Sequence, residues 1–221
     1  MRDIIQASTL LSVIGGGAHR LSEIAARVEK PATQLSRPLD KLVELGFVAR
    51  EIPFGEHPKN SKRSLYKIAD PFIDFYYRFV VPNRSLIGLG RTDTVFKDVK
   101  ENLNTYISRH WEQLCRKAVS GNTINGVTYL VASRWWGNVS REEVIEIDVV
   151  AQSADKKIIL AGECKWSNVS DGEALTANLI EKAKKMPFAK GKKIVPILFL
   201  KDCKQRSSHI LLPEDILKIN H

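Results

Sequence analysis

Two apolar runs joined by a short polar turn constrain the fold of this chain more than any other feature. They read VIEIDVVAQ (residues 144–152) and KKIILAGECKW (residues 156–166). Runs of this length, rich in Val and Ile, predict two adjacent antiparallel strands. With a loop of two or four residues, opposed positions sum to about 309, so Asp148 is expected to face Ala161. The sequence therefore predicts a β-hairpin inside an α/β domain.

Polar residues interrupt these apolar strands in a pattern that suggests a metal site. Because side chains alternate along a strand, Asp148, Glu163 and Lys165 are expected on one face and Cys164 on the other, in a core. Two carboxylates brought together raise each other's pKa, and Mg²⁺ or Mn²⁺ would relieve that repulsion with oxygen ligands. We predict a metal site at Asp148 and Glu163, with Lys165 acting on a water or a phosphate.

Residues 1–70 form a separate pattern of three helices and two short strands. Helical stripes cover residues 4–14, 21–28 and 35–45, and strands are expected over 47–50 and 65–68. This order resembles a winged helix-turn-helix domain. Many such domains bind DNA and many others dock proteins, so both remain open. If it binds DNA, the contacts expected from the third helix and the loop between the strands are Thr33, Gln34, Ser36, Arg37, Lys41, Lys59, Lys62 and Arg63.

The rest of the chain divides into a bridge and an α/β region. In residues 71–100, the aromatic stripe of PFIDFYYRFV is expected in a core or an interface, followed by a loop. A long helical pattern starts at Phe96 and leads into the α/β region, residues 101–221. This region contains a strand over 127–136, the hairpin, a helix near 172–185 and an apolar strand over 193–200. We therefore predict an α/β fold (α+β overall) in which a mixed central sheet follows the N-terminal domain.

The spacing of the polar residues resembles the PD-(D/E)xK nuclease superfamily. In that family an acid ends one strand, an acid-x-lysine lies on the next, and a glutamate often comes from the preceding helix. The matching residues are Asp148, the pair Glu163 and Lys165, and Glu112. Ile147 stands where the family name has proline. The resemblance implies a restriction-endonuclease-like core, Mg²⁺-dependent hydrolysis of DNA, and a role for Glu112 in a second metal position or in ordering the metal ligands.

A wider set of segments resembles the C-terminal part of a group of archaeal and bacterial AAA-type ATPases. The segments are DPFIDFYYRFV, RWWG, EIDVVA and GECKW, and they follow the winged-helix pattern. In that group a nuclease-like domain of uncertain function follows an ATP-binding module. This chain has no GxxxxGK[ST] motif, so no ATPase activity is expected from it. The resemblance implies an ATPase module as partner, in cis or in trans.

Composition bounds the partners and the compartment. A net charge of +9 favours a polyanion such as nucleic acid, and Lys184 and Lys185 are candidate contacts to its backbone. Three cysteines without a CxxC motif favour the reducing cytoplasm. The sequence contains no apolar run of about 18 residues, so it predicts no membrane-spanning helix. The sequence does not fix the oligomeric state, so an oligomer is compatible with it.

Three functional readings remain open at this point. The first is a metal-dependent DNA nuclease, and the second is a non-catalytic DNA- or protein-binding regulatory module on a nuclease-fold scaffold. The third is a winged-helix transcription regulator that dimerises through the helix starting at Phe96. A dispersed set of acids would favour the second reading over the first.

Overall fold

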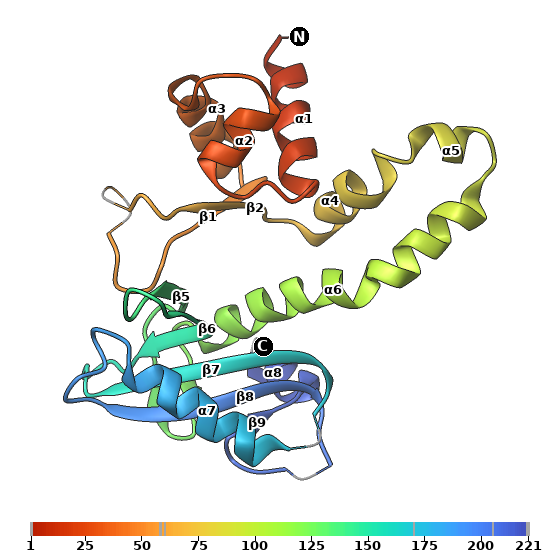
Figure 1. Ribbon diagram of the computed structural model, residues 1–221. Coiled ribbons are helices and arrows are strands. Elements are labelled where there is room, and N and C mark those ends of the chain that lie inside the picture. Colours follow the sequence, from red (N-terminus) through yellow and green to blue (C-terminus); the bar gives the residue numbers. More distant parts are fainter. Residues whose placement is uncertain (1, 58, 60, 170, 205, 220–221) are drawn as a thin grey trace. The chain divides into compact units, whose positions relative to one another are not determined.

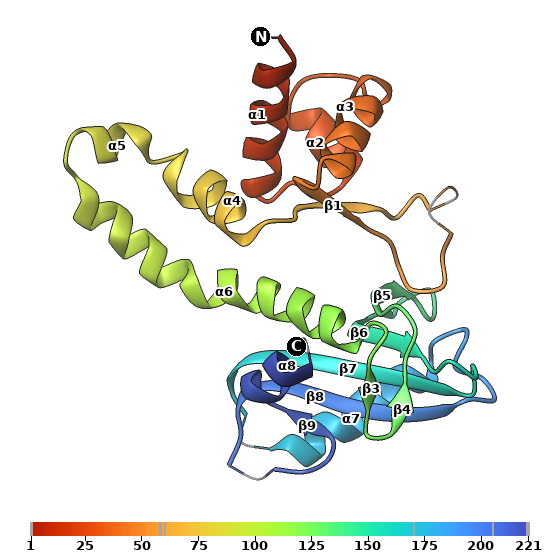
Figure 2. The ribbon, with the colours of Figure 1, turned by 180° about the vertical axis from the view of Figure 1, so that it is seen from behind.

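The computed structural model describes residues 2–57, 59, 61–169, 171–204 and 206–219. The chain divides into two compact units. One comprises residues 1–52 and 58–106, and the other residues 53–57 and 107–221. Figures 1 and 2 show the helices and strands from two opposite sides. No described helix is long and apolar enough to cross a bilayer.

The first unit begins with three helices and a small hairpin. The helices are α1 (Arg2–Gly15), α2 (Leu21–Arg27) and α3 (Ala32–Glu44), and the strands are β1 (Val48–Glu51) and β2 (Leu65–Ile68). Gly46 ends α3 with a φ of 76°, the left-handed conformation that glycine adopts freely. Leucines at helical spacing on α3 (Leu35, Leu39 and Leu42) are buried in the core against α1, α2 and the hairpin. The apolar stripes predicted these elements.

The segment after the hairpin completes the first unit. It contains α4 (Pro71–Phe75), the π-helical turn η1 (Tyr76–Val80), α5 (Arg84–Gly88) and the first part of α6 (Thr92–Val119). Asp70 caps α4 by accepting a hydrogen bond from the Ile73 N–H at 2.9 Å, and Pro71 occupies the first turn. The Tyr106 ring contacts the rings of Phe75 and Phe79. Phe75 and Phe79 therefore pack internally, as expected for the aromatic stripe, but Phe72 of the same stripe is 75% exposed. α5 lies in a stretch predicted as a loop.

The second unit is built on a five-stranded mixed sheet of order β5-β6-β7-β8-β9. Its strands are β5 (Ser133–Asn138), β6 (Val144–Gln152), β7 (Ile158–Asn168), β8 (Lys193–Asp202) and β9 (Ile210–Leu211). β5, β6 and β7 are antiparallel neighbours, whereas β8 runs parallel to β7 and β9 runs parallel to β8. The sequence predicts the mixed sheet but not β9 or the closing helix α8 (Pro213–Ile219).

Helices cover both faces of this sheet. The C-terminal part of α6 contributes Trp111 and Cys115 to the core on one face, together with Ile216 of α8. On the other face, α7 (Gly172–Lys184) contributes Leu179 and Ala183 to a second core. Figure 1 shows α7 crossing in front of the strands. We refer to the two sides of the sheet as the α6 face and the α7 face.

The region before the sheet differs from its predicted form. The single strand expected over residues 127–136 is split into β4 (Val127–Thr128), which pairs with β3 (Thr123–Ile124), and β5. Asn125 and Gly126 form the tight turn between β3 and β4 with φ values of 50° and 76°. Asparagine and glycine tolerate this left-handed backbone, and such a dipeptide is a strong hairpin signal. The hairpin therefore takes up Val127 and Thr128, and residues 129–132 separate β4 from β5.

Candidate functional site

The central hairpin forms, but its register is not the predicted one. Val149 pairs with Gly162, and Val150 pairs with Ala161. Asp148 therefore does not face Ala161, and that prediction is wrong. Residues 153–157 join the two strands, and Lys156 in this loop adopts a φ of 63°. The shift moves the two strands past each other by two positions.

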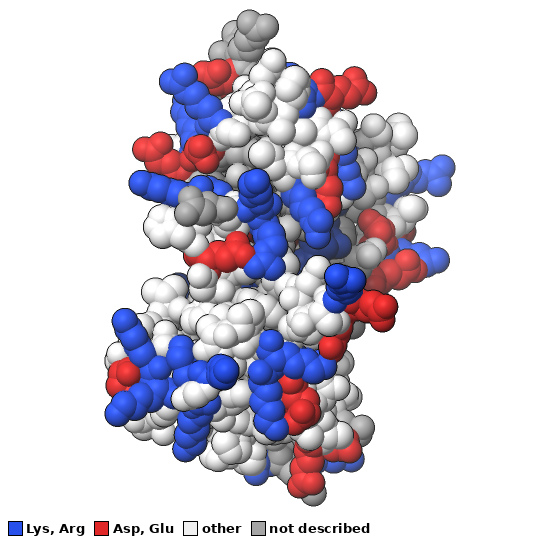
Figure 3. All heavy atoms as spheres, turned by 60° about the vertical axis from the view of Figure 1, so that its left-hand side comes forward, with Lys and Arg blue, Asp and Glu red and all other residues white. Residues whose placement is uncertain are grey.

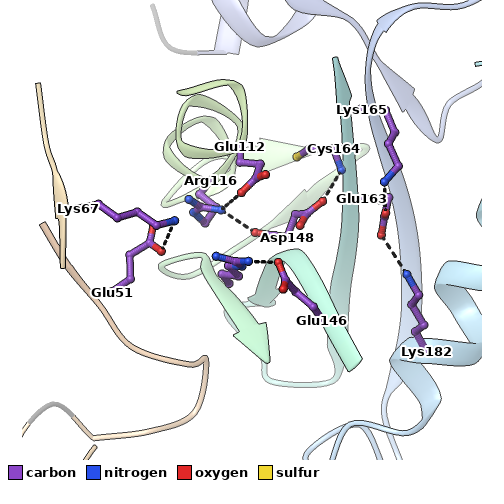
Figure 4. Close-up of polar contacts among 11 residues, drawn as sticks. Glu51, Lys67, Glu112, Arg116, Glu146, Asp148, Glu163, Cys164, Lys165 and Lys182 are labelled. Atoms are coloured by element: carbon purple, nitrogen blue, oxygen red, sulfur yellow. Dashed lines mark hydrogen bonds and ion pairs between the residues drawn. The ribbon is translucent and has the colours of Figure 1, made fainter. Parts of the chain in front are cut away.

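A β-bulge in β6 then separates Asp148 from Glu163. Ser133 of β5 pairs with Val150, but Trp135 pairs with Ile147, so two residues of β6 lie opposite Arg134 alone. As a result Ile147 and Val150 both belong to the core on the α7 face, and Val149 belongs to the core on the α6 face. Figure 4 shows the Asp148 carboxylate directed at the Cys164 N–H of β7, with Glu163 on the other side of that strand. The expected common face for Asp148, Glu163 and Lys165 is therefore not formed.

Asp148 is surrounded mainly by other acids on the α6 face. Its Oδ2 accepts a hydrogen bond from the Cys164 backbone N–H at 2.9 Å. Burial first, and then the charge of Glu112, raise the pKa of this carboxyl to about 7 against the lowering effect of that hydrogen bond, and the charges of Glu163 and Glu146 add to the rise. Arg116 of α6 donates to the backbone carbonyl of Asp148 at 2.9 Å.

Arg116 is engaged mainly with its own helix and with the backbone of β6. Its Nη1 lies 3.6 Å from Oε2 of Glu112, one turn earlier on α6. Only 9% of the Arg116 side chain is exposed. The i, i+4 spacing of an acid and an arginine was a sequence signal for this pair. Sequence reasoning assigned Glu112 a role but did not identify Arg116 as part of the site.

Glu163 has cationic neighbours on the α7 face. Its Oε1 lies 2.7 Å from Nζ of Lys165, and its Oε2 lies 3.6 Å from Nζ of Lys182 on α7. Burial lowers the pKa of Lys165, but the hydrogen bond and charge of Glu163 outweigh that effect, so the pKa is raised overall. Figure 4 shows both lysines directed at Glu163. The expected proximity of Glu163 and Lys165 is therefore found.

Cys164 points into the core opposite Glu163, as expected from strand alternation. It packs with Trp111 and Cys115 on the α6 face. Burial raises the pKa of the Cys164 thiol well above its usual value, and the neighbouring Cys115 thiol adds to that effect. A thiol in this environment is a packing residue and a poor nucleophile.

These positions decide how well the site fits the Mg²⁺ or Mn²⁺ that the sequence suggested. Such ions require several oxygen ligands around one point. Within residues 2–57, 59, 61–169, 171–204 and 206–219, no group of three or more His, Cys, Asp or Glu side chains could hold a metal ion. Asp148 and Glu163 occupy opposite faces, and Glu163 already contacts two lysines. The residues in this arrangement do not fit a divalent cation.

The residues predicted to contact nucleic acid are mostly exposed. On α3, the exposed set is Thr33, Gln34, Arg37 and Lys41. Ser36 is half-buried, and its hydroxyl donates to the Ala32 carbonyl at 3.4 Å. Lys59, Lys62 and Arg63 are exposed in the loop between β1 and β2. In the second unit, Lys184 contacts Glu181 at 2.7 Å and Lys185 contacts Glu143 at 2.5 Å.

Comparisons with known proteins place this chain among uncharacterised relatives. Residues 76–177 match a family described as archaea bacterial proteins of unknown function, DUF234. An uncharacterized protein from Methanocaldococcus jannaschii is 33% identical over 165 residues, which cover 73% of this chain. The match covers 36% of that relative, so the chain spans about a third of its length.

A solved structure also resembles the chain weakly. The crystal structure of protein VC1899 from Vibrio cholerae matches with a TM-score of 0.30 and 12% identity. The match covers 99% of this chain and 54% of that one. A likeness at this level carries no argument about function.

Proposed function

We propose that this chain is a non-catalytic DNA-binding regulatory module, in which the N-terminal helices and hairpin act as a winged helix. The observation that carries the proposal is the exposed row on α3 formed by Thr33, Gln34, Arg37 and Lys41. The leucines on the opposite side of α3 anchor it in the core. A helix held in this way can present polar side chains to base edges in a major groove.

Charge supports the same proposal. Lys and Arg outnumber Asp and Glu by 34 to 25. Figure 3 shows basic side chains spread over one face of the molecule with acids between them. We propose that Lys62 and Arg63, which are exposed in the hairpin loop, contact phosphates of the DNA backbone. Such contacts fix the position of a protein on the duplex but do not read the base sequence.

The α/β unit is proposed to act as a scaffold of the restriction-endonuclease-like type. The dispersed positions of Asp148 and Glu163 favour this role over catalysis. Since the chain spans about a third of the Methanocaldococcus relative, we further propose that it is the non-ATPase portion of a larger AAA-type ATPase, or works with such a module in trans.

Salt-dependent DNA binding tests the main proposal. We expect the full chain to bind a 30-base-pair duplex with an affinity that falls steeply with salt. Arg37→Ala and Lys41→Ala together should weaken binding by roughly tenfold or more and reduce the logarithmic salt slope by about 2. Lys97→Ala, on an exposed part of α6, is the matched control and should change neither. An unchanged salt slope in the double variant would refute the assignment of α3.

A second candidate is a Mg²⁺-dependent DNA nuclease, and one observation favours it. Asp148 is a buried carboxylate whose pKa is raised to about 7 by burial and by the charge of Glu112. Carboxyls perturbed in this way concentrate at functional sites. A rearrangement bringing Asp148 and Glu163 together is required before a cation could bind both.

Cleavage assays separate the two candidates. Supercoiled, linear and branched DNA would be incubated with the chain and Mg²⁺ or Mn²⁺. Cleavage that is lost in both Glu163→Gln and Lys165→Ala would support the nuclease and overturn the non-catalytic reading. DNA binding that persists in Asp148→Ala without any cleavage would support the scaffold.

A further inference from the structure

A groove with an apolar floor runs between α1 and α3 of the first unit. Its volume is about 450 Å³. Ala7 and Leu10 of α1 and Leu42 of α3 line its floor, while Ile4 and Leu45 stand at its margins. The groove lies wholly within one compact unit.

The margins of this groove expose more apolar surface than the fold requires. Ile4 is 73% exposed and Leu45 is 59% exposed. Both residues could be polar without loss to the core, because the neighbouring Leu10 and Leu42 already fill it. Contiguous exposed apolar side chains around a concave surface are typical of a binding site for another molecule.

The dimensions of the groove fit a helix. On α1 its lining extends from Asp3 to Leu10, and on α3 from Arg37 to Leu45. At 1.5 Å per residue, each stretch is about 10–12 Å long, or roughly two helical turns. Two walls of this length, with an aliphatic floor, match the mode in which an amphipathic helix inserts residues at i, i+4 and i+7.

Charge on the rim selects the kind of helix. Arg37 and Lys41 lie one turn apart on the α3 side of the groove, opposite a single acid, Asp3. Asp40 is exposed on α3 but does not line the groove. The α3 rim is therefore basic, and acids spaced i, i+4 on a bound helix would face it.

We propose that the groove between α1 and α3 binds an acidic amphipathic helix of a partner protein. The apolar face of that helix covers the floor of the groove, and its acids pair with Arg37 and Lys41. The same two residues belong to the proposed DNA-contacting row, so the partner and DNA compete for α3. The competition rests on the proposed function, whereas binding in the groove does not.

A designed peptide provides the direct test. The probe is a synthetic 18-residue helix with leucines at i, i+4, i+7 and i+11 and glutamates along one flank, and its control carries lysine in place of each glutamate. Fluorescence anisotropy with the full chain should show saturable binding of the acidic peptide and at least tenfold weaker binding of the basic one. Amide shifts in NMR spectra should map to α1 and α3. No saturable binding, or equal affinity for both peptides, would overturn the proposal.

Matched variants locate the site. Ile4→Ser and Leu45→Ser together should weaken binding of the acidic peptide at least tenfold, because both side chains lie at the margins of the groove. Leu89→Ser is the control, since Leu89 is 76% exposed in the same unit but outside the groove. If instead Leu45→Ser abolishes self-association and leaves peptide affinity unchanged, the occupant is a second copy of this chain and the proposal fails.

Competition with DNA separates this inference from the proposed function. Peptide binding without any DNA binding would support the proposal that the groove binds an acidic helix, and it would refute the DNA-binding role. DNA binding without peptide binding would do the reverse. If both occur, the acidic peptide should displace the duplex in proportion to its occupancy of the groove, and simultaneous binding would overturn the competition.

Discussion

The carboxylates on the two faces of the central sheet lie in opposite electrostatic environments. On the α7 face, Glu163 lies against Lys165 and Lys182. On the α6 face, Asp148 lies near Glu112, and Arg116 donates a hydrogen bond to the backbone carbonyl of Asp148. Glu163 and Cys164 are sequence neighbours, yet strand alternation sends them to different environments. The comparison teaches that one backbone bulge decides which acid is neutralised by protein cations and which is left with a raised pKa.

The largest expected effect comes from Asp148→Asn. The pKa of about 7 in the folded chain lies above the value of roughly 3.9 for an unfolded aspartate. Ionisation therefore favours the unfolded state, and the wild type loses stability as the pH rises from about 4 through 7. Asparagine keeps an acceptor for the Cys164 N–H and carries no charge. The variant should match the wild type near pH 4 and exceed it by up to about 4 kcal/mol at pH 8.

Urea unfolding at both pH values measures this difference. The wild-type and variant chains would be compared at each pH, so that other titrating groups cancel. A stability difference that does not grow with pH would mean that ionisation of Asp148 does not destabilise the folded chain, which would contradict the raised pKa of this carboxyl.

Gly162→Ala should destabilise the α6 face by about 1–3 kcal/mol through overpacking. A Cβ at this position would lie 2.6 Å from the Phe199 ring and 2.8 Å from the Cβ of Val149. Gly88→Ala in α5 is the matched control, because a Cβ there meets nothing within 4 Å. The control should be neutral or slightly stabilising, and equal losses in both variants would refute the packing argument.

Glu163→Gln tests the opposite face. Only 11% of the Glu163 side chain is exposed, but Lys165 and Lys182 are 40% and 35% exposed, so solvent screens the interaction. Leaving the two lysines without their carboxylate should cost about 1–2 kcal/mol in urea unfolding at pH 7. The loss should shrink in the double variant with Lys165→Met, as expected for a coupled pair. Strict additivity would contradict the assigned ion pair.

Glu181→Gln should have the smallest effect. Glu181 pairs with Lys184 at 2.7 Å, but both side chains are well exposed on α7. Exposed pairs of this kind contribute little because water and salt screen them. We expect no resolvable change in the urea midpoint. A clear shift would show that charges outside the sheet interior also matter to the stability of this face.

Local patterns predicted the elements that carry most of the fold. The leucine stripe on α3 and the apolar run of β8 each have a direct chemical reason for their structure. The weaker elements were missed for equally physical reasons. α5 and β9 are short, and Val127 and Thr128 pair with β3 across the Asn125-Gly126 turn, so β4 ends well before β5 begins at Ser133.

The candidate site was predicted in part. Alternation along β7 correctly placed Lys165 beside Glu163 and sent Cys164 into the core. The register and the bulge were beyond the sequence, because a hairpin sequence fits more than one loop length. Arg116 was also missed, although its spacing from Glu112 indicated a pair. The catalytic, metal-binding and DNA-binding roles of these residues stay predictions.

The sequence by itself determined which residues can form strands, which helix faces are buried and which side chains carry charge, because these follow from residue types at periods of 2 and 3.6. Only the tertiary structure decided where Asp148 lies. Opposite Arg134, β6 holds two residues against one, and this extra residue turns Asp148 toward α6. Such a shift depends on how β5, β6 and β7 pack together, a property of three strands at once that no single segment encodes.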